Sequence, residues 1–223
     1  MAERPDIEEH HANRRGGGAQ PNAYAVVDMF ERRVAAFAGA PFAVATDSCT
    51  SALLLCCRYL QAGEVVLPAR TYASVPMAIL HAGGRVRFVD RPWSGQYQLD
   101  PLPVWDAAKR FRRGMFSELP ADPSSWRYQC LSFHIKKPLP IGRGGMILTD
   151  NRQAADWFRM ARRDGRSDTG GGVWAEVVGH NAYLTPEQAA RGLMLMDVMP
   201  PGGLPDHDEL GGYPDLREMP AFR

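Results

Sequence analysis

Segments with a helical hydrophobic pattern alternate with short strand-like segments along most of this sequence, and this alternation limits the possible folds more than any other feature. The pattern predicts helices over 24–38, 51–60, 73–81, 152–163 and 186–196. It predicts strands over 42–45, 64–67, 85–89, 128–133 and 145–149. Because a helix between two strands usually crosses over the sheet, we expect an α/β fold with three αβα layers around a mostly parallel sheet.

The remaining segments divide the chain into three parts. Residues 1–20 form an Arg- and Gly-rich tail without periodic apolar positions, so we expect this tail to be mobile. Residues 21–199 carry the alternating pattern and are predicted to form one α/β domain. Within it, the proline-rich stretch 91–125 is predicted to be mostly loop, with one helical piece over 104–112. Residues 200–223 are rich in Pro and Gly and are predicted to be an extended tail.

The composition argues against several classes of partner and site. With 26 Lys and Arg against 25 Asp and Glu, the formal net charge is +1, so we expect no nucleic-acid or membrane partner. The polar pair His10 and His11 has no further ligands nearby, so we predict no metal site. The spacing of the four cysteines fits neither a zinc ribbon nor a disulfide scaffold, so we expect a reducing, cytoplasmic setting.

The first half of the chain contains two candidate sites, one after a predicted strand and one within the proline-rich stretch. Each also has an ordinary structural explanation. The sequence Ser48-Cys49-Thr50-Ser51 stands at a strand-to-helix junction, where free backbone N–H groups and hydroxyls can bind a phosphate. The alternative is a simple helix N-cap. Asp106 has apolar neighbours and could pair with a cationic ring nitrogen; the alternative is a carboxylate at a helix start, favoured by the helix dipole.

Two further candidates lie in the second half of the chain. Ser132-Phe133-His134-Ile135-Lys136-Lys137 directly follows a predicted strand, where ligands bind in α/β sheets, and a lysine shielded from water there can attack an aldehyde. The alternative is two solvated lysines in a loop. Gly179-His180-Asn181 by itself predicts only a turn.

Taken in order, these motifs resemble the DegT/DnrJ/StrS-type sugar aminotransferase family, which has the fold type I architecture of enzymes that use pyridoxal 5′-phosphate (PLP). The resemblance runs from Tyr24 to about Leu195 and includes the Pro68-Ala69-Arg70-Thr71-Tyr72 segment and the Ser-Phe-His-x-x-Lys spacing. It implies that Lys137, rather than Lys136, holds PLP as an internal aldimine, and that Asp106 hydrogen-bonds the pyridine nitrogen.

The resemblance also implies roles for the other cofactor-binding residues. Ser132, Cys49 and Thr50 are expected to hold the cofactor phosphate, with Ser51 close by. Tyr72 is expected to stack on the cofactor ring. Lys109 is expected to lie near the ring hydroxyl. Asn181 is expected to reach the phosphate of the neighbouring subunit, which implies a homodimer with shared active sites.

The activity implied by the resemblance is the transfer of an amino group from a donor such as glutamate to a keto group, usually of a nucleotide-linked sugar. Sugar dehydration is disfavoured, because in that branch of the family a histidine replaces the lysine found here as Lys137. Two alternatives stay open: a PLP- or ligand-binding regulatory or assembly protein without turnover, and a transaminase for a non-sugar ketone.

The sequence departs from the family pattern at several places. Only residues 200–223 follow the last matched helix, where family members have a substantial C-terminal domain. The stretch between Asp90 and Asp106 is far shorter than usual, so we expect a strand-helix unit of the sheet to be missing. Single residues also differ from the usual family residues at four positions: Cys49, Lys109, Arg143 and Tyr183.

Overall fold

The computed structural model describes residues 22–166, 175–206 and 212–223. The predicted N-terminal tail, including His10 and His11, lies outside these residues. Within the described ranges, no helix has both the length and the apolar composition needed to cross a bilayer. The same ranges contain no group of three or more His, Cys, Asp or Glu side chains placed to bind a metal.

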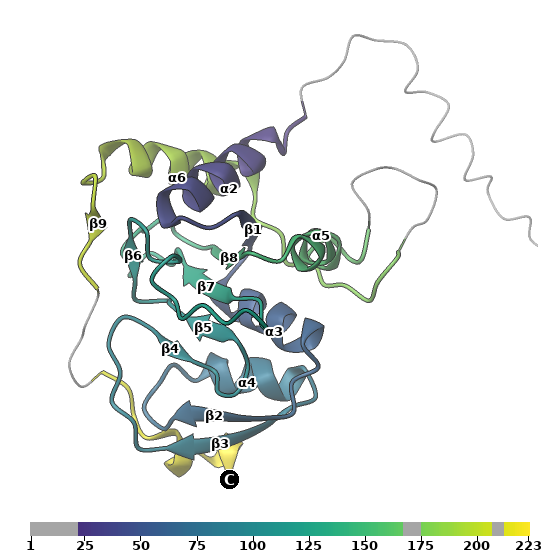
Figure 1. The fold of residues 1–223 in the computed structure, drawn as a ribbon, viewed down its shortest axis with the longest axis vertical. Helices are drawn as coiled ribbons and strands as arrows, with labels where there is room; N and C mark the ends of the chain where they lie inside the picture. Colours follow the sequence, from purple (N-terminus) through teal and green to yellow (C-terminus); the bar gives the residue numbers. More distant parts are fainter. Residues whose placement is uncertain (1–21, 167–174, 207–211) are drawn as a thin grey trace, which may run out of the picture.

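A five-stranded sheet forms the centre of the molecule (Figure 1). Its strands are, in spatial order, β1 (Phe42–Thr46), β8 (Gly145–Thr149), β7 (Tyr128–Ser132), β5 (Val104–Asp106) and β4 (Tyr97–Gln98). A separate two-stranded sheet contains β2 (Glu64–Pro68) and β3 (Arg85–Val89), which pair in parallel over five residues. The strands predicted from the sequence are therefore all present, with ends that differ by at most one residue.

The α/β class is confirmed, but the sheet is mixed rather than mostly parallel. In the central sheet the β1–β8, β7–β8 and β4–β5 pairs are antiparallel, and only β5–β7 is parallel. Residues 133–144 connect β7 to β8 without a helix, so the chain turns back and the two strands must run in opposite directions. The alternation of strands and helices could not show this, because it does not specify which strands become neighbours.

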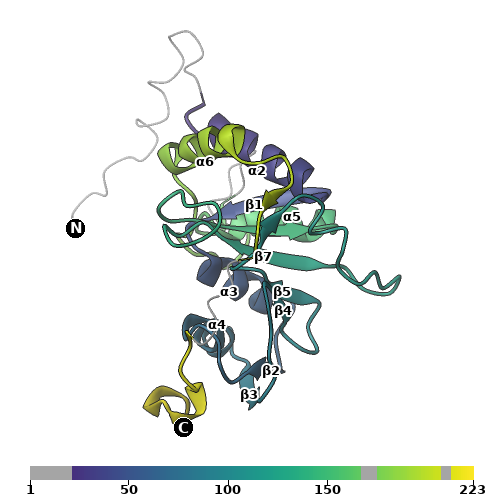
Figure 2. The same ribbon diagram turned by 90° about the vertical axis from the view of Figure 1, so that its left-hand side faces the viewer.

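Helices cover both faces of the central sheet (Figure 2). The two helices on one face are α2 (Ala25–Ala38) and α6 (Pro186–Val198). The two on the other face are α3 (Cys49–Tyr59) and α5 (Arg152–Ala161), while α4 (Ser74–His81) packs against α3 and β3. Successive side chains of β8 point to opposite faces of the sheet: Met146 packs in the core with α2, and Ile147 packs in the core with α3. All five residues of β8 are therefore buried, as a strand between two helical layers requires.

The predicted helix over 104–112 is wrong. This stretch forms β5, a turn, and the short strand β6 (Phe111–Arg112). Its apolar residues recur with helical spacing, but the tertiary pairing of β5 with β7 decides the structure. Hydrogen bonds at both ends of β5 extend this pairing: Tyr128 donates to the Pro103 carbonyl, and Ala107 donates to the Cys130 carbonyl, each at 2.9 Å.

The shortened stretch before β5 fills the space between the two sheets. Strand β4 pairs with β5, and shortly after β4 the Val66 N–H of β2 donates to the Asp100 carbonyl at 2.7 Å. This bridge links the backbone of the β2–β3 sheet to the segment after β4, and the hydroxyls of Thr71 and Tyr97 form a second link at 2.6 Å. The connection carries far fewer hydrogen bonds than the five-residue pairings of β8 with its two neighbours.

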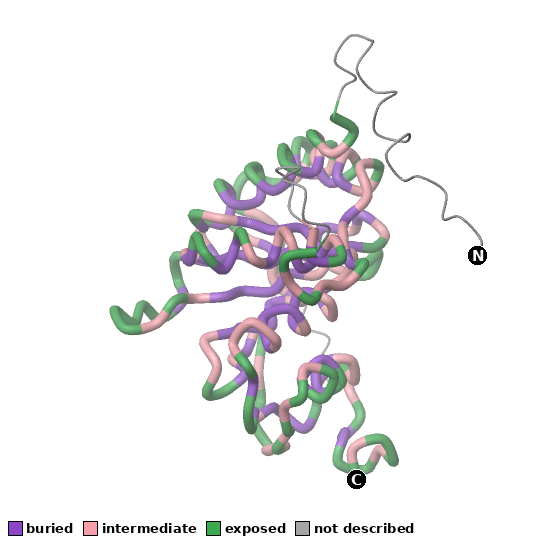
Figure 3. The backbone as a smooth tube through the Cα atoms, turned by 90° about the vertical axis from the view of Figure 1, so that its right-hand side faces the viewer, coloured by how far each residue is buried: buried purple, intermediate pink, exposed green. Residues whose placement is uncertain are grey.

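The C-terminal residues pack on the chain itself. Strand β9 (Gly203–Leu204) pairs with β6, and after the undescribed residues 207–211 two short 3₁₀ helices follow, η1 (Leu216–Glu218) and η2 (Pro220–Phe222). The Leu216 N–H donates to the Ala69 carbonyl at 2.9 Å, and the Leu216 side chain is buried. Figure 3 shows this mostly exposed end of the chain beside the end of the molecule that holds β2 and β3.

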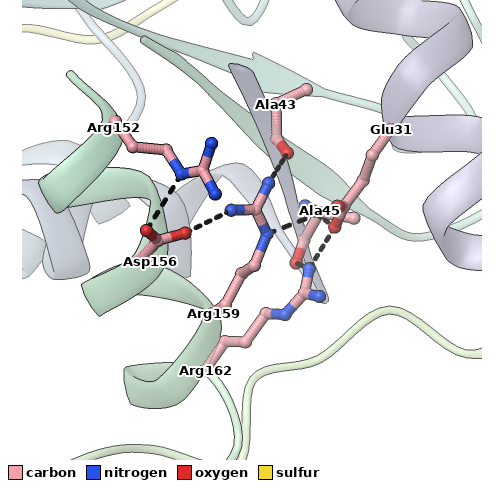
Figure 4. Close-up of polar contacts among 7 residues, drawn as sticks. All are labelled: Glu31, Ala43, Ala45, Arg152, Asp156, Arg159 and Arg162. Carbon is pink, nitrogen blue, oxygen red and sulfur yellow. Dashed lines mark hydrogen bonds and ion pairs between the residues drawn. The ribbon is translucent and has the colours of Figure 1, made fainter. Parts of the chain in front are cut away.

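A buried ion pair joins α2, β1 and α5 (Figure 4). The Glu31 carboxylate of α2 contacts the guanidinium of Arg162, and both side chains are about 6% exposed. The same two side chains bind opposite sides of one residue in β1, since Ala45 donates its N–H to Glu31 at 2.8 Å and accepts from Arg162 at 2.7 Å. This network fixes the strand that leads directly into the candidate site.

Candidate active site

The N-terminus of α3 forms one wall of a cavity. Ser48 caps this helix, because its Oγ accepts a hydrogen bond from the Ser51 N–H at 3.1 Å, so the simple N-cap interpretation is confirmed for Ser48. Cys49 and Thr50 follow and line the cavity. The N–H groups of a first helical turn and the helix dipole favour an anion at this wall.

Gly145 of β8 allows α3 to begin this close to the sheet. A Cβ atom at Gly145 would approach the Ser48–Cys49 peptide more closely than 3.0 Å. Only glycine therefore fits beneath the start of α3, and it brings the helix N-terminus next to the end of β7. This explains why the glycine-rich turn 142–145 accompanies the lysine motif in the sequence.

Lys137 reaches the cavity from a tight turn after β7. The Lys137 N–H donates to the His134 carbonyl at 2.8 Å, and the Lys136 N–H donates to His134 Nδ1 at 3.2 Å. This turn places both lysines in the lining of the cavity together with Ser132. Lys137 is partly buried and Lys136 is exposed. The choice of Lys137 over Lys136 stays a prediction.

Asp106 lies buried at the end of β5, so the interpretation of this residue as a helix-start carboxylate is wrong. One carboxylate oxygen accepts from the Ala108 N–H at 3.0 Å, and the other accepts from the Tyr97 hydroxyl at 3.1 Å. Burial raises the pKa of Asp106, while these two hydrogen bonds and the charge of Lys137 act in the opposite direction. A cationic partner would therefore stabilise the ionised carboxylate.

Cys49 lies against the same carboxylate. Its Sγ donates to Asp106 at 3.8 Å, and burial together with the Asp106 charge raises the pKa of the thiol well above its usual value. The thiol is thus held protonated and does not act as a nucleophile. Cys56 and Cys57 are also buried and free, with pKa values raised by burial, as expected for inert cysteines.

Lys109 stands at the same end of the cavity as Asp106 and is only 7% exposed. Its Nζ lies 4.9 Å from the ring centroid of Trp93 and 4.7 Å from that of Tyr213, distances typical of cation–π contacts. Tyr72 also lines this end and is 60% exposed, so its ring is available to a planar ligand.

The cavity has a volume of about 600 Å³ and gathers seven of the nine predicted site residues: Cys49, Thr50, Tyr72, Asp106, Lys109, Ser132 and Lys137. The other two do not line it. Ser51 lies one turn into α3 with its Oγ 3.0 Å from that of Ser48. Asn181 is exposed on the chain surface, where it forms a bridge with Arg163.

The structure adds residues to the lining that the sequence did not identify, among them Ser74, Trp93 and Tyr213. Ser74 binds Thr50 through their hydroxyls at 2.7 Å, but nothing in its local sequence distinguishes it. Trp93 and Tyr213 are single aromatic residues in Pro- and Gly-rich stretches, and only the fold brings them together. The chain contains three lysines, and all three line this one cavity.

Comparison with known proteins agrees with this arrangement. The model of the DegT/DnrJ/EryC1/StrS aminotransferase family matches residues 9–116 and 125–200, which is most of the chain. The chain belongs to this family. Family membership confirms the resemblance recognised in the sequence and accounts for the common order of the α3 junction, the lysine turn and the Gly179-His180-Asn181 motif.

The relatives are longer than this chain. The spore coat polysaccharide biosynthesis protein SpsC of Bacillus subtilis (strain 168) is 27% identical over 215 residues, which cover 75% of this chain and 55% of SpsC. DesV of S. venezuelae, solved in complex with a ketimine intermediate, matches with a TM-score of 0.60 and 20% identity over 85% of this chain and 60% of DesV. DesI, solved in the presence of its TDP-sugar product, matches with a TM-score of 0.59 and 24% identity over 86% of this chain and 56% of DesI.

Proposed function

We propose that this protein is a PLP-dependent aminotransferase that moves an amino group from a donor such as glutamate to a keto group, in the first instance of a nucleotide-linked sugar. The observation that carries the proposal is the meeting of Lys137 and Asp106 in one cavity with the N-terminus of α3. Family membership and the TDP-sugar product named for DesI support the sugar substrate.

The chemistry of the cavity fits the cofactor. A phosphate is dianionic, and the α3 N-terminus and the hydroxyls of Thr50 and Ser132 can bind it. Because burial disfavours the ionised form of Asp106, a cation beside it would stabilise the carboxylate, and a protonated ring nitrogen is such a cation. The amine of Lys137 can bond an aldehyde carbon. A volume of about 600 Å³ also lies within the range of known cofactor pockets.

The residues then divide the work of the reaction. When bound, PLP supplies an electron sink for charge that develops on the substrate carbon. Asp106 keeps a proton on the ring nitrogen, and Tyr97 orients Asp106 by its hydrogen bond. Tyr72 would stack on the bound ring, and Lys109 would face its hydroxyl. Once a donor amine has displaced it, the Lys137 amine is free to move a proton at the substrate carbon.

We also propose that two chains share the work. Asn181 is exposed and lies outside the lining of its own cavity, which is where a residue that serves the other subunit belongs. A homodimer with two-fold symmetry would bring each Asn181 to the phosphate end of its partner's cavity. The small formal net charge of +1 favours small-molecule substrates over nucleic acid or an anionic membrane.

The test is to incubate the protein with PLP, reduce it with borohydride, and locate the modified lysine by peptide mass spectrometry. We expect modification at Lys137, its loss in Lys137→Ala, and its persistence in the matched control Lys136→Ala. Glutamate added before the reduction should remove the modification and yield 2-oxoglutarate. If the amount of PLP-modified lysine is unchanged by every amino donor in a panel, the protein is not an aminotransferase, and a binding protein without turnover is favoured. Modification at Lys136 or Lys109 alone would contradict the role of Lys137.

A further inference from the structure

The C-terminal segment, defined here as residues 212–223, places an aromatic side chain inside the candidate active site. The ring of Tyr213 lies nearly parallel to that of Trp93, at an interplanar angle of 15° and a centroid distance of 6.2 Å. It also contacts Tyr72 edge to face at 6.2 Å. Tyr213 therefore touches aromatic residues from two separate loops that line the cavity.

These rings enclose the ammonium group of Lys109. Tyr213 and Trp93 each place a ring face within 5 Å of Lys109 Nζ. Lys109 is a cation with a long flexible side chain, and such residues are rarely buried without a specific reason. Trp93 also packs on Tyr97 with ring centroids 4.7 Å apart, and Tyr97 donates a hydrogen bond to Asp106, so the rings hold a positive group at the end of the cavity where the buried carboxylate lies.

Several contacts anchor the C-terminal segment close to Tyr213. Leu216 is 1% exposed and is hydrogen-bonded to Ala69, just after β2. The buried Asp215 accepts from Arg217, whose guanidinium also binds Asp90 after β3 at 2.9 Å. Phe222 packs against Phe88 with ring centroids 5.8 Å apart. The segment is thus fixed to the carboxyl ends of β2 and β3, and Tyr213 is carried into the cavity from there.

We propose that Tyr213 is a positioning residue of the active site, which together with Trp93 holds the Lys109 ammonium at the Asp106 end of the cavity. Lys109 and Asp106 then present one cation and one anion to a planar ligand. Lys109 can contact an anionic ring oxygen, and Asp106 can contact a cationic ring nitrogen. The identity of that ligand rests on the proposed function. The positioning of Lys109 does not, and it can be tested without any cofactor.

The first experiment measures how fast each lysine of the cofactor-free protein reacts with a water-soluble amine-acylating reagent. With three lysines in the chain, mass spectrometry resolves every site, and the exposed Lys136 serves as the internal reference. We expect Tyr213→Ala to raise the rate at Lys109 about tenfold, since it removes one of two cation–π partners, and to leave Lys136 unchanged. Tyr213→Phe keeps the ring face and should retain the slow rate.

Leu216→Ala provides a second route to the same result. Leu216 does not line the cavity, so the loss of its buried side chain should affect Lys109 only by loosening the C-terminal segment. We expect the Lys109 rate to rise in this variant too. Unchanged Lys109 reactivity in both Tyr213→Ala and Leu216→Ala, or an equal rise in Tyr213→Phe, would overturn the proposal. Circular dichroism checks that each variant is folded.

The second experiment measures PLP binding and the absorbance spectrum of the bound form. We expect Tyr213→Ala to weaken binding and change the spectrum, because Lys109 no longer faces the ring oxygen, whereas Tyr213→Phe should behave as the wild type. Tighter binding in Tyr213→Ala would overturn the proposal, since the Tyr213 ring would then occupy the ligand's place. If the wild type fails to bind PLP through Lys137, the proposed function fails, while the labelling result still decides the role of Tyr213.

Discussion

The two regions that meet at the cavity are built in different ways. The region of β1, β8 and β7 carries Lys137, Ser132 and the start of α3, and it is joined by two five-residue strand pairings and the buried Glu31–Arg162 pair. The region of β2, β3 and the C-terminal segment carries Tyr72 and Tyr213. It joins the central sheet through the Val66–Asp100 bridge, the hydrogen bond between the Thr71 and Tyr97 hydroxyls and the apolar side chains of β2, and no residue of β3 is buried.

This difference teaches where the site is rigid and where it is adaptable. Covalent chemistry and phosphate binding need groups fixed to a fraction of an ångström, and they are assigned to the deeply buried region. Two aromatic residues expected near the ring, Tyr72 and Tyr213, come from the less buried region, where β3 and most of the C-terminal segment are not buried and small movements meet less resistance. Three substitutions can break or sharpen this comparison.

The largest effect on stability is expected from the buried ion pair. Glu31→Gln leaves the Arg162 guanidinium buried without its carboxylate, which typically costs about 3–5 kcal/mol. The matched control is Asp197→Asn, which breaks the exposed Arg33–Asp197 pair and should cost at most about 1 kcal/mol. Urea unfolding of both variants measures the difference. Equal costs for the two variants would remove the energetic distinction between the two regions.

A smaller effect, on ligand binding, is expected from Gly145→Ala. Its new Cβ must displace the Ser48–Cys49 peptide, so the α3 N-terminus would move away from the phosphate position. We expect the affinity for PLP to fall about a hundredfold, equivalent to about 2.7 kcal/mol. The control is Gly63→Ala, where no other atom lies within 4 Å of the new Cβ, and titration with PLP compares the two. Wild-type affinity in Gly145→Ala would mean that the start of α3 is adaptable after all.

The sequence predicted the strands of both regions, but not the segments that meet between them, for a physical reason. The strands β1 and β8 are almost continuous apolar runs, and the motifs around Ser48 and Lys137 are contiguous, so local pattern and local chemistry coincide. The segments that meet between the two regions, namely β5, residues 93–98 and the C-terminal segment, come from distant parts of the chain. Helical spacing of apolar residues over 104–112 concealed β5, and nothing local in a Pro- and Gly-rich tail marks Tyr213 as part of a site.

For Asp106, the sequence predicted the residue but not its structural surroundings. The order of the family motifs identified the residue, yet its strand, its burial and its Tyr97 partner follow from tertiary pairing with β7 and β4. Trp93 and Tyr97, whose ring centroids lie 4.7 Å apart, likewise lie in a stretch that the sequence predicted as loop. Local sequence thus identifies which residues form the site, whereas tertiary pairing decides their burial and their hydrogen-bond partners.

The smallest effect, on the order of 1 kcal/mol, is expected from Asp106→Asn in the cofactor-free protein. Burial raises the folded-state pKa of Asp106 above its unfolded value, so the folded state holds this proton more tightly. That contribution to stability is fully present below the unfolded pKa and is lost as the pH rises through the folded pKa. Asn cannot ionise, so the stability of the variant relative to the wild type should increase with pH across this window.

Urea unfolding at a series of pH values from 4 to neutral, the former close to the ~3.9 of an unperturbed Asp, measures this relative stability. Asp122→Asn is the control with the opposite sign, because hydrogen bonds from Ser124 lower the pKa of Asp122, whose carboxylate therefore stabilises the fold above its unfolded pKa. Saturating PLP should reverse the Asp106 result, since a cationic ring nitrogen favours the ionised carboxylate and the wild type gains more from binding than the variant. A pH-independent difference between Asp106→Asn and the wild type would show that burial does not hold the proton on Asp106, and the case for a cation at this end of the cavity would fall with it.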